Sequence, residues 1–157
     1  MAEKKYVEYI FTDVKPMDPP LPVPKRILEQ KEAGNYIDST WMFALDDSVA
    51  KGAFYTNCVW IWEKVGNEDL KLEIAHTHDF DETIGFIGTV RDNPRELGGE
   101  IEFWLEDEQF VFDKSCLIYV PRGMKHLPLY LRRVDSPIFF WTAGNGTAYT
   151  RTSGNEA

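Results

Sequence analysis

An alternation of apolar and polar residues leads directly into two histidines, and it constrains the fold of this chain more than any other feature. Positions 70, 72 and 74 are Leu, Leu and Ile, and positions 71 and 73 are Lys and Glu. Alternate side chains of a β-strand share one face, so the pattern predicts a strand with one apolar, inward face. The same parity continues to His76 and His78, which we therefore expect to point inward.

A second segment carries the third histidine. Pro121-Arg122-Gly123 has the composition of a tight turn, and this turn is expected to deliver His126 to the same region. The chain contains three histidines, so all of them fall in these two segments. The sequence therefore predicts the two halves of one metal site.

The distribution of aromatic residues predicts an all-β protein. The 5 Trp, 7 Tyr and 10 Phe lie mostly in short runs bounded by Gly, Pro, Asn and Asp, which favours strands. With 157 residues, one packed core is expected. About ten short strands predict a sandwich or a closed barrel over residues 35–143. Residues 144–157 are rich in Gly, Asn, Thr and Ser, which predicts a flexible tail or a flap over the barrel mouth.

The charge and hydropathy exclude several classes of partner. A net charge of -9 repels phosphate backbones and anionic lipid, so no nucleic-acid or membrane partner is expected. The first residues lead into no long apolar stretch, and no run is long enough to span a bilayer, which predicts a cytoplasmic protein. Cys58 and Cys116 are expected to be reduced, buried thiols rather than a disulfide.

Residues 1–34 are expected to form an N-terminal arm and a short helix. Lys5–Val14 is predicted as an edge strand, and the prolines of Pro16–Pro24 predict an extended arm with few backbone donors. Arg26–Ala33 is predicted to be helical and to end at Gly34. Because the arm is apolar, something must cover it, and this predicts a homodimer in which the arm packs on the partner near Trp60. The alternative is an arm that folds back on its own barrel.

The strand predicted for residues 53–65 places Cys58, Trp60 and Trp62 on one face. Large aromatic residues on one strand face are most often core or interface residues. The alternative is that Trp60 and Trp62, together with Phe86 and Phe140, line an apolar pocket for a small aromatic ligand.

The two histidine segments resemble the motifs of the cupin superfamily, which are jelly-roll β-barrels with one metal site. The first motif is His, one residue, His, three residues, Glu; the second contains Pro, Gly and His. The matching residues are His76, His78 and Glu82, and Pro121, Gly123 and His126. The likeness covers roughly residues 73–142. The chain departs from the family pattern at Leu70 and Ser115, where the motifs usually open with Gly, and these positions are not metal ligands.

The resemblance implies a jelly-roll barrel in which His76, His78, Glu82 and His126 bind a divalent metal ion. Three imidazoles and one carboxylate suit Fe, Mn, Co, Ni, Cu or Zn rather than Ca or Mg. Four protein ligands on an octahedral ion leave two positions for water, substrate or dioxygen.

Three functions remain open at this point. One is a dioxygenase-type oxidoreductase acting on a small organic acid or aromatic compound, and another is an isomerase or lyase in which the metal acts as a Lewis acid. The third is a cupin that binds a metabolite without turnover. Tyr130 and Arg132 share strand parity with His126, so they are candidate catalytic residues, Tyr130 for proton transfer and Arg132 for a substrate carboxylate. The alternative for Arg132 is a position at the barrel rim.

Overall fold

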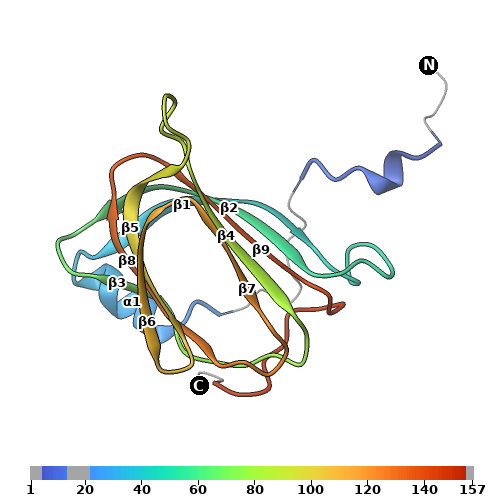
Figure 1. The fold of residues 1–157 in the computed structure, drawn as a ribbon. Coiled ribbons are helices and arrows are strands. Elements are labelled where there is room, and N and C mark those ends of the chain that lie inside the picture. The colour runs from blue at the N-terminus through green and yellow to red at the C-terminus, as the bar shows by residue number, and fades with distance from the viewer. Residues whose placement is uncertain (1–4, 14–21, 155–157) are drawn as a thin grey trace.

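The computed structural model describes residues 5–13 and 22–154, and within them nine strands form two antiparallel sheets. Figure 1 shows the two sheets facing each other around an oval barrel. The five-stranded sheet has the order β1-β2-β9-β4-β7, and the four-stranded sheet has the order β3-β8-β5-β6. The strands are β1 (Tyr36–Leu45), β2 (Thr56–Val65), β3 (Leu70–Glu73), β4 (Glu82–Gly88), β5 (Glu96–Leu105), β6 (Glu108–Lys114), β7 (Cys116–Val120), β8 (His126–Val134) and β9 (Ile138–Gly144).

The topology follows from a chain that doubles back on itself at one turn. Residues 106 and 107 connect β5 to β6, and Glu106 has a φ of 51°, the left-handed conformation that tight hairpin turns use. From this turn outward, β5 pairs with β6, β4 with β7, β3 with β8 and β2 with β9, always antiparallel. This long double strand is wrapped into two sheets, which is a jelly roll. The predicted fold class is therefore confirmed.

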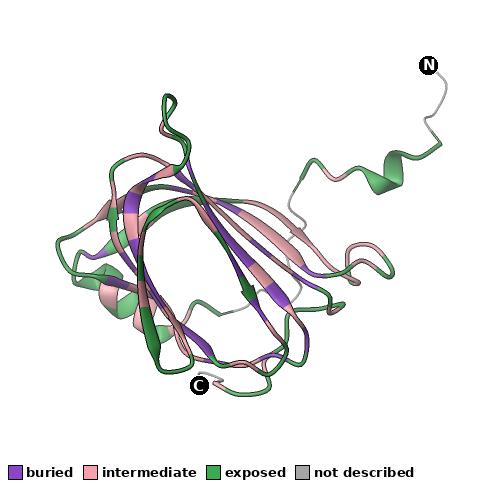
Figure 2. Cartoon of the chain, viewed as in Figure 1, coloured by how far each residue is buried: buried purple, intermediate pink, exposed green. Residues whose placement is uncertain are grey.

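The core lies between the sheets and is built from alternate residues of each strand. Phe86, Ile101, Phe103, Leu131 and Ile138 have no exposed surface. Figure 2 shows this alternation as short buried stretches along strands whose other residues are partly exposed. A barrel filled in this way holds its strands in fixed register, because a slip of one residue would exchange the apolar and polar faces.

The helix α1 (Lys25–Glu32) covers the open edge of β3. Gln30 donates to the carbonyl of Lys71 at 3.0 Å and accepts from the Lys71 amide at 2.8 Å. One side chain thus satisfies the backbone groups that a neighbouring strand would otherwise pair with. The predicted helix is present, and Gly34 follows it with a φ of 79°. No helix among the described residues is long and apolar enough to cross a membrane.

The predicted edge strand at residues 5–14 is wrong over its described part. Val7–Tyr9 forms a short 3-10 helix without buried residues. Most of the predicted proline arm lies outside the described residues; within it, Val23 is 56% exposed.

One interpretation of the sequence makes Trp60 and Trp62 core residues of β2, and the structure shows the opposite face in the core. Val59 and Ile61 are buried, whereas Trp60 and Trp62 stack on each other on the outer face, with ring centroids 5.3 Å apart. Phe139 of β9 packs against Trp60 at 5.1 Å. Both faces of β2 are apolar, so the two β-branched residues can fill the narrow core while the larger indoles remain outside. We call Trp60, Trp62 and Phe139 the outer aromatic patch.

Candidate metal centre

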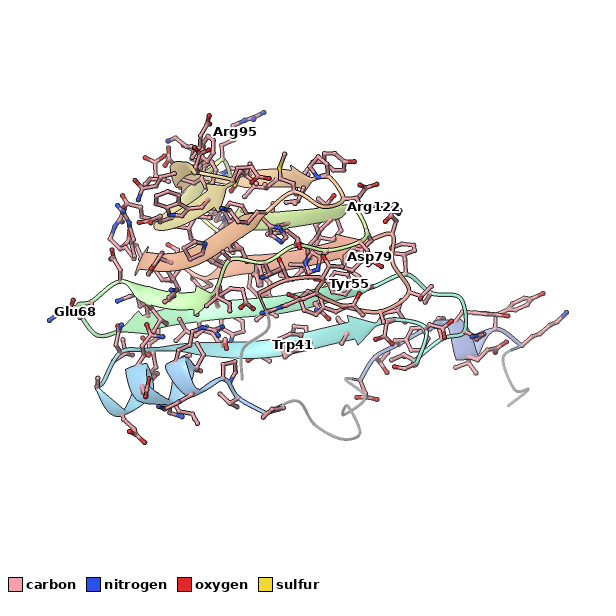
Figure 3. All side chains as sticks on the ribbon, turned by 90° about the horizontal axis from the view of Figure 1, so that it is seen from below. Trp41, Tyr55, Glu68, Asp79, Arg95 and Arg122 are labelled. Atoms are coloured by element: carbon pink, nitrogen blue, oxygen red, sulfur yellow. The ribbon has the colours of Figure 1, made fainter. Side chains whose placement is uncertain are left out.

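Two loops at one end of the barrel bring the histidines together. Strand β3 ends at Glu73, and the chain continues in an extended loop in which His76 forms an antiparallel bridge with His126. The amide of each of these two residues donates to the carbonyl of the other at 3.1 Å. Figure 3 shows Asp79 and Arg122, which belong to the two loops, at the same end of the barrel, opposite Glu68.

The second loop turns as its Pro and Gly predict. The amide of Met124 donates to the carbonyl of Pro121 at 3.0 Å, and Gly123 has a φ of 79°, which a residue with a Cβ rarely adopts. The amide of Gly123 donates to the carbonyl of His78 at 2.9 Å. The turn is therefore anchored to the first histidine loop.

All three imidazoles present the same nitrogen to a common point. Nδ1 of His76 lies 2.8 Å from the carbonyl oxygen of Ile74, Nδ1 of His78 lies 2.5 Å from that of Thr150, and Nδ1 of His126 lies 3.1 Å from that of Met124. A carbonyl oxygen only accepts, so each Nδ1 carries the proton and each Nε2 keeps its lone pair. Metal-binding histidines are oriented by such contacts.

The three ligand nitrogens lie within 4.8 Å of one another. The histidines are at most 2% exposed. The ring of Phe80 stacks on that of His78 with centroids 4.6 Å apart, which fixes the plane of this imidazole. Of the groups that the described residues offer for a metal ion, these three nitrogens form a compact, buried set.

Glu82 faces the histidines from the first residue of β4. Its Oε2 lies 3.4 Å from Nε2 of His78 and 3.2 Å from Nε2 of His126. Nε2 of His126 is buried and has no hydrogen-bond partner of acceptable geometry among the described residues. Two nitrogen lone pairs and a carboxylate oxygen thus face each other across about 3 Å, an arrangement that a bound cation makes favourable. The side chains present therefore fit a metal ion.

The electrostatics keep these groups in the form that binds metal. Burial and, to a smaller extent, the neighbouring His126 lower the pKa of His76 to about 3. Burial by itself would raise the pKa of Glu82, but the adjoining imidazoles of His126 and His78 outweigh this and hold the pKa at about 2. At neutral pH the site thus contains a neutral His76 and an ionised Glu82, and metal binding needs no proton release from them.

Tyr55 and Thr142 support Glu82 from behind. The Tyr55 hydroxyl donates to Oε1 of Glu82 at 3.0 Å, and it is also hydrogen-bonded to Oγ1 of Thr142. Burial raises the pKa of Tyr55, so the phenol stays protonated. Sequence reasoning did not single out these residues. The parity of β9 would have placed Thr142 inside, but Tyr55 lies in a loop, where no periodicity applies.

The C-terminal segment of residues 145–154 contacts the histidine loop. The amide of Thr152 donates to the carbonyl of Thr77 at 2.9 Å. The Tyr149 hydroxyl lies 3.2 Å from Nε2 of His76, and its ring packs edge-on against that of His78 with centroids 5.1 Å apart. Burial raises the pKa of Tyr149 to about 12, so this phenol is also neutral. Neither Tyr149 nor Arg151 was identified from the sequence.

Arg151 connects this segment to the base of the histidine loop. Its Nε donates to the Tyr149 hydroxyl at 3.2 Å, and its guanidinium pairs with Oε2 of Glu73 at 2.7 Å. The other carboxylate oxygen of Glu73 pairs with Arg26 of α1 at 3.1 Å. The loop, the helix and the C-terminal segment are therefore joined by one buried or half-buried ionic network.

Tyr130 and Arg132 are not brought to the histidines. They alternate with buried Leu129 and Leu131 and lie on the outer face of the four-stranded sheet, where Arg132 pairs with Glu102. The reason is a bulge: β5 advances two residues from Phe103 to Leu105 while β8 advances three between their partners. The extra residue reverses the faces of β8 after His126. The catalytic role predicted for Tyr130 and Arg132 stays a prediction, without a contact to the histidines.

The aromatic pocket proposed from the sequence is not formed. Phe86 and Phe140 stack on each other inside the barrel with centroids 5.0 Å apart, whereas Trp60 and Trp62 lie on the outer face. The two pairs are therefore on opposite sides of one sheet. Phe80 and Tyr149 do adjoin the histidines, and Tyr55 packs against both of these rings.

Comparison with known proteins supports the fold. No family model and no curated protein matches the chain. Among solved structures, peruvianin-I, a cysteine peptidase from Thevetia peruviana latex, aligns over 95% of this chain and 78% of its own, with 9% identity and a TM-score of 0.53. At this identity the likeness shows the fold alone.

Two further structures are similar over less of the chain. KdgF from Halomonas sp. has 16% identity and a TM-score of 0.40 over 68% of this chain and 77% of its own. Lactobacillus farciminis oxalate decarboxylase, solved as a formate complex, has 14% identity and a TM-score of 0.47 over 74% of this chain and 31% of its own. This chain thus spans about a third of the length of the decarboxylase. Both proteins are cupin-fold proteins.

Proposed function

We propose that this chain, which has the cupin fold, is a metal-dependent enzyme acting on a small organic acid or aromatic compound. His76, His78, Glu82 and His126 are the proposed ligands of one divalent transition metal ion. The observation that supports this most is the convergence of three Nε2 lone pairs and a carboxylate oxygen at a buried point. Neutral imidazoles with one carboxylate suit Fe, Mn, Co, Ni, Cu or Zn.

The proposed reaction is of the dioxygenase type. When bound, the ion supplies Lewis acidity and, if it is iron, one-electron chemistry with oxygen. The chain's own contribution is to hold the ligand set rigid through the three Nδ1 contacts, to exclude bulk water and to place hydroxyl donors beside the reacting molecule. Tyr55 orients Glu82, and Tyr149 lies beside His76 on the side of the C-terminal segment.

A second candidate is an isomerase or lyase in which the metal polarises a carbonyl group. The proximity of the Tyr149 hydroxyl to His76 favours it, because such reactions need a protonated group beside the polarised oxygen. Oxygen uptake by the iron-loaded protein with a panel of small carboxylic acids and phenols separates the two. Consumption of oxygen with a substrate supports the dioxygenase, and product formation without oxygen supports the isomerase or lyase. Saturable binding without any product supports a metabolite-binding protein.

Metal analysis of His78→Ala tests the proposed site. The variant should lose most bound metal and still fold, because the apolar stripe that precedes His78 is unchanged. Asp79→Ala is the matched control, since this exposed carboxylate is the next residue in the same loop. It should retain wild-type metal content. Full metal occupancy in a folded His78→Ala protein would refute the assignment.

We also propose a homodimer that buries the outer aromatic patch. Trp62 is 40% exposed, and Leu117 and Tyr119 on the same face of the five-stranded sheet are more than 60% exposed. Contiguous apolar surface of this kind is usually covered by a partner. The proposed role of the arm of residues 16–24 falls mostly outside the described residues, and the cytoplasmic location stays a prediction.

Light scattering with point variants tests the dimer. Leu117→Lys should reduce the measured mass to that of one chain, whereas Val111→Lys, at a 46% exposed position on the other sheet, should leave it unchanged. A wild-type mass of one chain would contradict the dimer. Deletion of residues 1–24 tests the arm separately, since a dimer that survives it does not depend on the arm.

A further inference from the structure

We propose that metal binding at this centre and docking of the C-terminal segment are thermodynamically linked, so that each strengthens the other. The segment of residues 145–154 is then docked on the histidine loop when an ion is bound, and it opens more readily when the ion is absent. The proposal rests on the proposed metal site, and it goes further by naming the part of the chain that regulates this site.

The three imidazoles differ in where their Nδ1 acceptors come from. Nδ1 of His76 and Nδ1 of His126 each donate to the carbonyl two residues earlier in the same loop, at 2.8 and 3.1 Å. Nδ1 of His78 donates instead to the carbonyl of Thr150, 72 residues away in the C-terminal segment, at 2.5 Å. The ring of Phe80 fixes the plane of His78 but offers no acceptor. The barrel loops therefore orient two of the imidazoles, and the C-terminal segment completes the third.

The segment pairs with the residue that separates the two proposed ligands of the first loop. Because His76 and His78 point inward, Thr77 between them points outward. The amide of Thr152 donates to the Thr77 carbonyl at 2.9 Å, and Thr77 forms an antiparallel bridge with Ser153. The Thr77 hydroxyl also lies 2.7 Å from the hydroxyls of both Thr152 and Ser153. The segment thus adds a strand-like pairing to the histidine loop.

The segment is held by polar contacts rather than by buried apolar surface. Its beginning is anchored to the barrel, since the carbonyl of Thr147 accepts from the amide of Asp47 at 2.9 Å. Beyond this point none of residues 148–154 is buried, and Tyr149 is 38% exposed. A segment with so little buried surface can open locally while the rest of the domain stays folded. The docked and open forms are therefore two states of one folded protein.

Metal binding favours the docked form through His78. An imidazole that shares its Nε2 lone pair with a cation becomes a stronger donor at Nδ1, so its hydrogen bond to Thr150 gains strength when the ion is bound. The contact of the Tyr149 hydroxyl with Nε2 of His76 acts in the opposite sense, because the ion takes that lone pair. Tyr149 is partly exposed, so water can replace this acceptor. The balance favours docking, and docking therefore raises metal affinity by the same factor.

Two measurements on the full-length protein test the linkage. The first is the rate at which trypsin cleaves between Arg151 and Thr152, with and without cobalt(II). In the docked form Arg151 pairs with Glu73 and the Thr152 amide is hydrogen-bonded, so cleavage requires the open form. Cleavage after Arg91, in the exposed loop that follows β4, shows whether cobalt affects trypsin itself. The second measurement is the dissociation constant of cobalt(II), from its visible absorption.

Gly154→Ala displaces the end of the segment. Its Cβ would meet the carbonyl oxygen of Ala75 at 2.2 Å and Cβ of His76 at 2.7 Å. The segment should yield rather than the loop, because His76 is held to His126 by two backbone hydrogen bonds. Gly34→Ala is the matched control, since Gly34 has a φ of 79° against 72° for Gly154, and its added Cβ would meet no described atom beyond its chain neighbours within 4 Å.

Thr152→Pro is a second variant for the affinity measurement. Proline removes the amide donor to Thr77, and the substituted residue is exposed. It opens the segment without placing an atom against a histidine. Agreement between Thr152→Pro and Gly154→Ala therefore separates undocking from a direct push on His76.

The expected result is one factor seen from both sides. Cobalt should slow cleavage after Arg151 in the wild type by about tenfold to a hundredfold, the range for groups that orient a metal ligand, and leave cleavage after Arg91 unchanged. Gly154→Ala and Thr152→Pro should raise the dissociation constant of cobalt by a factor in the same range. Metal-free Gly154→Ala should be cleaved faster than wild type, and Gly34→Ala should match wild type throughout.

Each other outcome overturns the proposal in a distinguishable way. If wild-type protein does not bind cobalt, the proposed metal site fails and this proposal fails with it. If cobalt binds but does not slow cleavage after Arg151, the metal site stands and the linkage is refuted, whatever the variants show. If cobalt protects Gly154→Ala as well as wild type, the protection comes from overall stabilisation. If Gly34→Ala weakens cobalt binding as much as Gly154→Ala, backbone strain and not docking is responsible, and the linkage is again refuted.

Discussion

Replacing Tyr55 by Phe removes one oxygen atom from behind the metal centre and leaves the packing unchanged. Tyr55 is 3% exposed, and its hydroxyl donates to Glu82 at 3.0 Å. Its ring packs against Phe80 and Tyr149, with centroids 5.9 and 5.3 Å away, and Phe can keep both contacts. The substitution therefore isolates the hydrogen bond.

The magnitude follows from the charge and burial of the acceptor. A hydrogen bond to an ionised group contributes about 1.5–3 kcal/mol. Glu82 is itself 3% exposed, so water cannot readily replace the lost donor. We expect the free energy of unfolding of the metal-free protein to fall by about this amount. Because Glu82 is a proposed ligand, cobalt affinity should fall by about tenfold to a hundredfold, as for other residues that orient ligands.

Urea unfolding of the metal-free protein and cobalt titration of the folded protein measure the two effects. Tyr36→Phe is the control, since Tyr36 lies on edge strand β1 and forms no side-chain hydrogen bond among the described residues. A Tyr55→Phe protein as stable as this control, with unchanged cobalt affinity, would refute the role of Tyr55 in holding Glu82.

Three further predictions concern acid stability, close packing and the covered sheet edge. His76 has a pKa of about 3 when folded and about 6.5 when unfolded, so only the unfolded chain gains its proton between these values. The free energy of unfolding of the metal-free protein should therefore fall by about 1.4 kcal/mol per pH unit from this group as the pH falls below 6.5. Glu82, with a pKa lowered to about 2, adds to the loss below pH 4.5. Urea midpoints that stay flat from pH 7 to pH 4 would contradict this prediction. Gly88→Ala places a Cβ 2.0 Å from the carbonyl oxygen of Glu96. Thermal unfolding should therefore show that the free energy of unfolding falls by about 3 kcal/mol or more. A change below about 1 kcal/mol would show that the strands can move apart to accept the methyl group. Gln30→Ala removes both hydrogen bonds to Lys71 and should cost about 1–3 kcal/mol, with faster amide exchange at Lys71; unchanged exchange would show that α1 does not protect the edge.

The alternation of apolar and polar residues determined the strands and the inward direction of two proposed ligands. His76 and His78 are separated by one residue, and this spacing places them on one side of any extended segment, whatever packs around it. This is why they point inward although β3 ends at Glu73 and they lie in a loop. The Pro and Gly of the second motif likewise determined a turn locally, through the backbone conformations they allow.

Where both faces of a strand are equally apolar, only the tertiary structure decided which face is buried. Both faces of β2 are apolar, so parity alone could not tell that Val59 and Ile61 fill the core and that Trp60 and Trp62 remain outside. The bulge in β8 reversed the facing of Tyr130 and Arg132. Pro128 lies within this bulge and is a local sign of it, but the pairing with β5 decides how many residues the bulge adds.

The support of the site was also decided in three dimensions. Tyr55, Tyr149 and Arg151 lie in segments without periodicity. Tyr55 contacts Glu82, Tyr149 contacts His76, and Arg151 holds Tyr149. Their contacts exist because the jelly roll returns the C-terminal segment to the end of the barrel where the two histidine loops meet. The sequence alone therefore determined which side chains could bind a metal ion, since ligand chemistry and two-residue spacing are local properties. The closure of the barrel decided which side chains orient them, since that depends on contacts between distant segments.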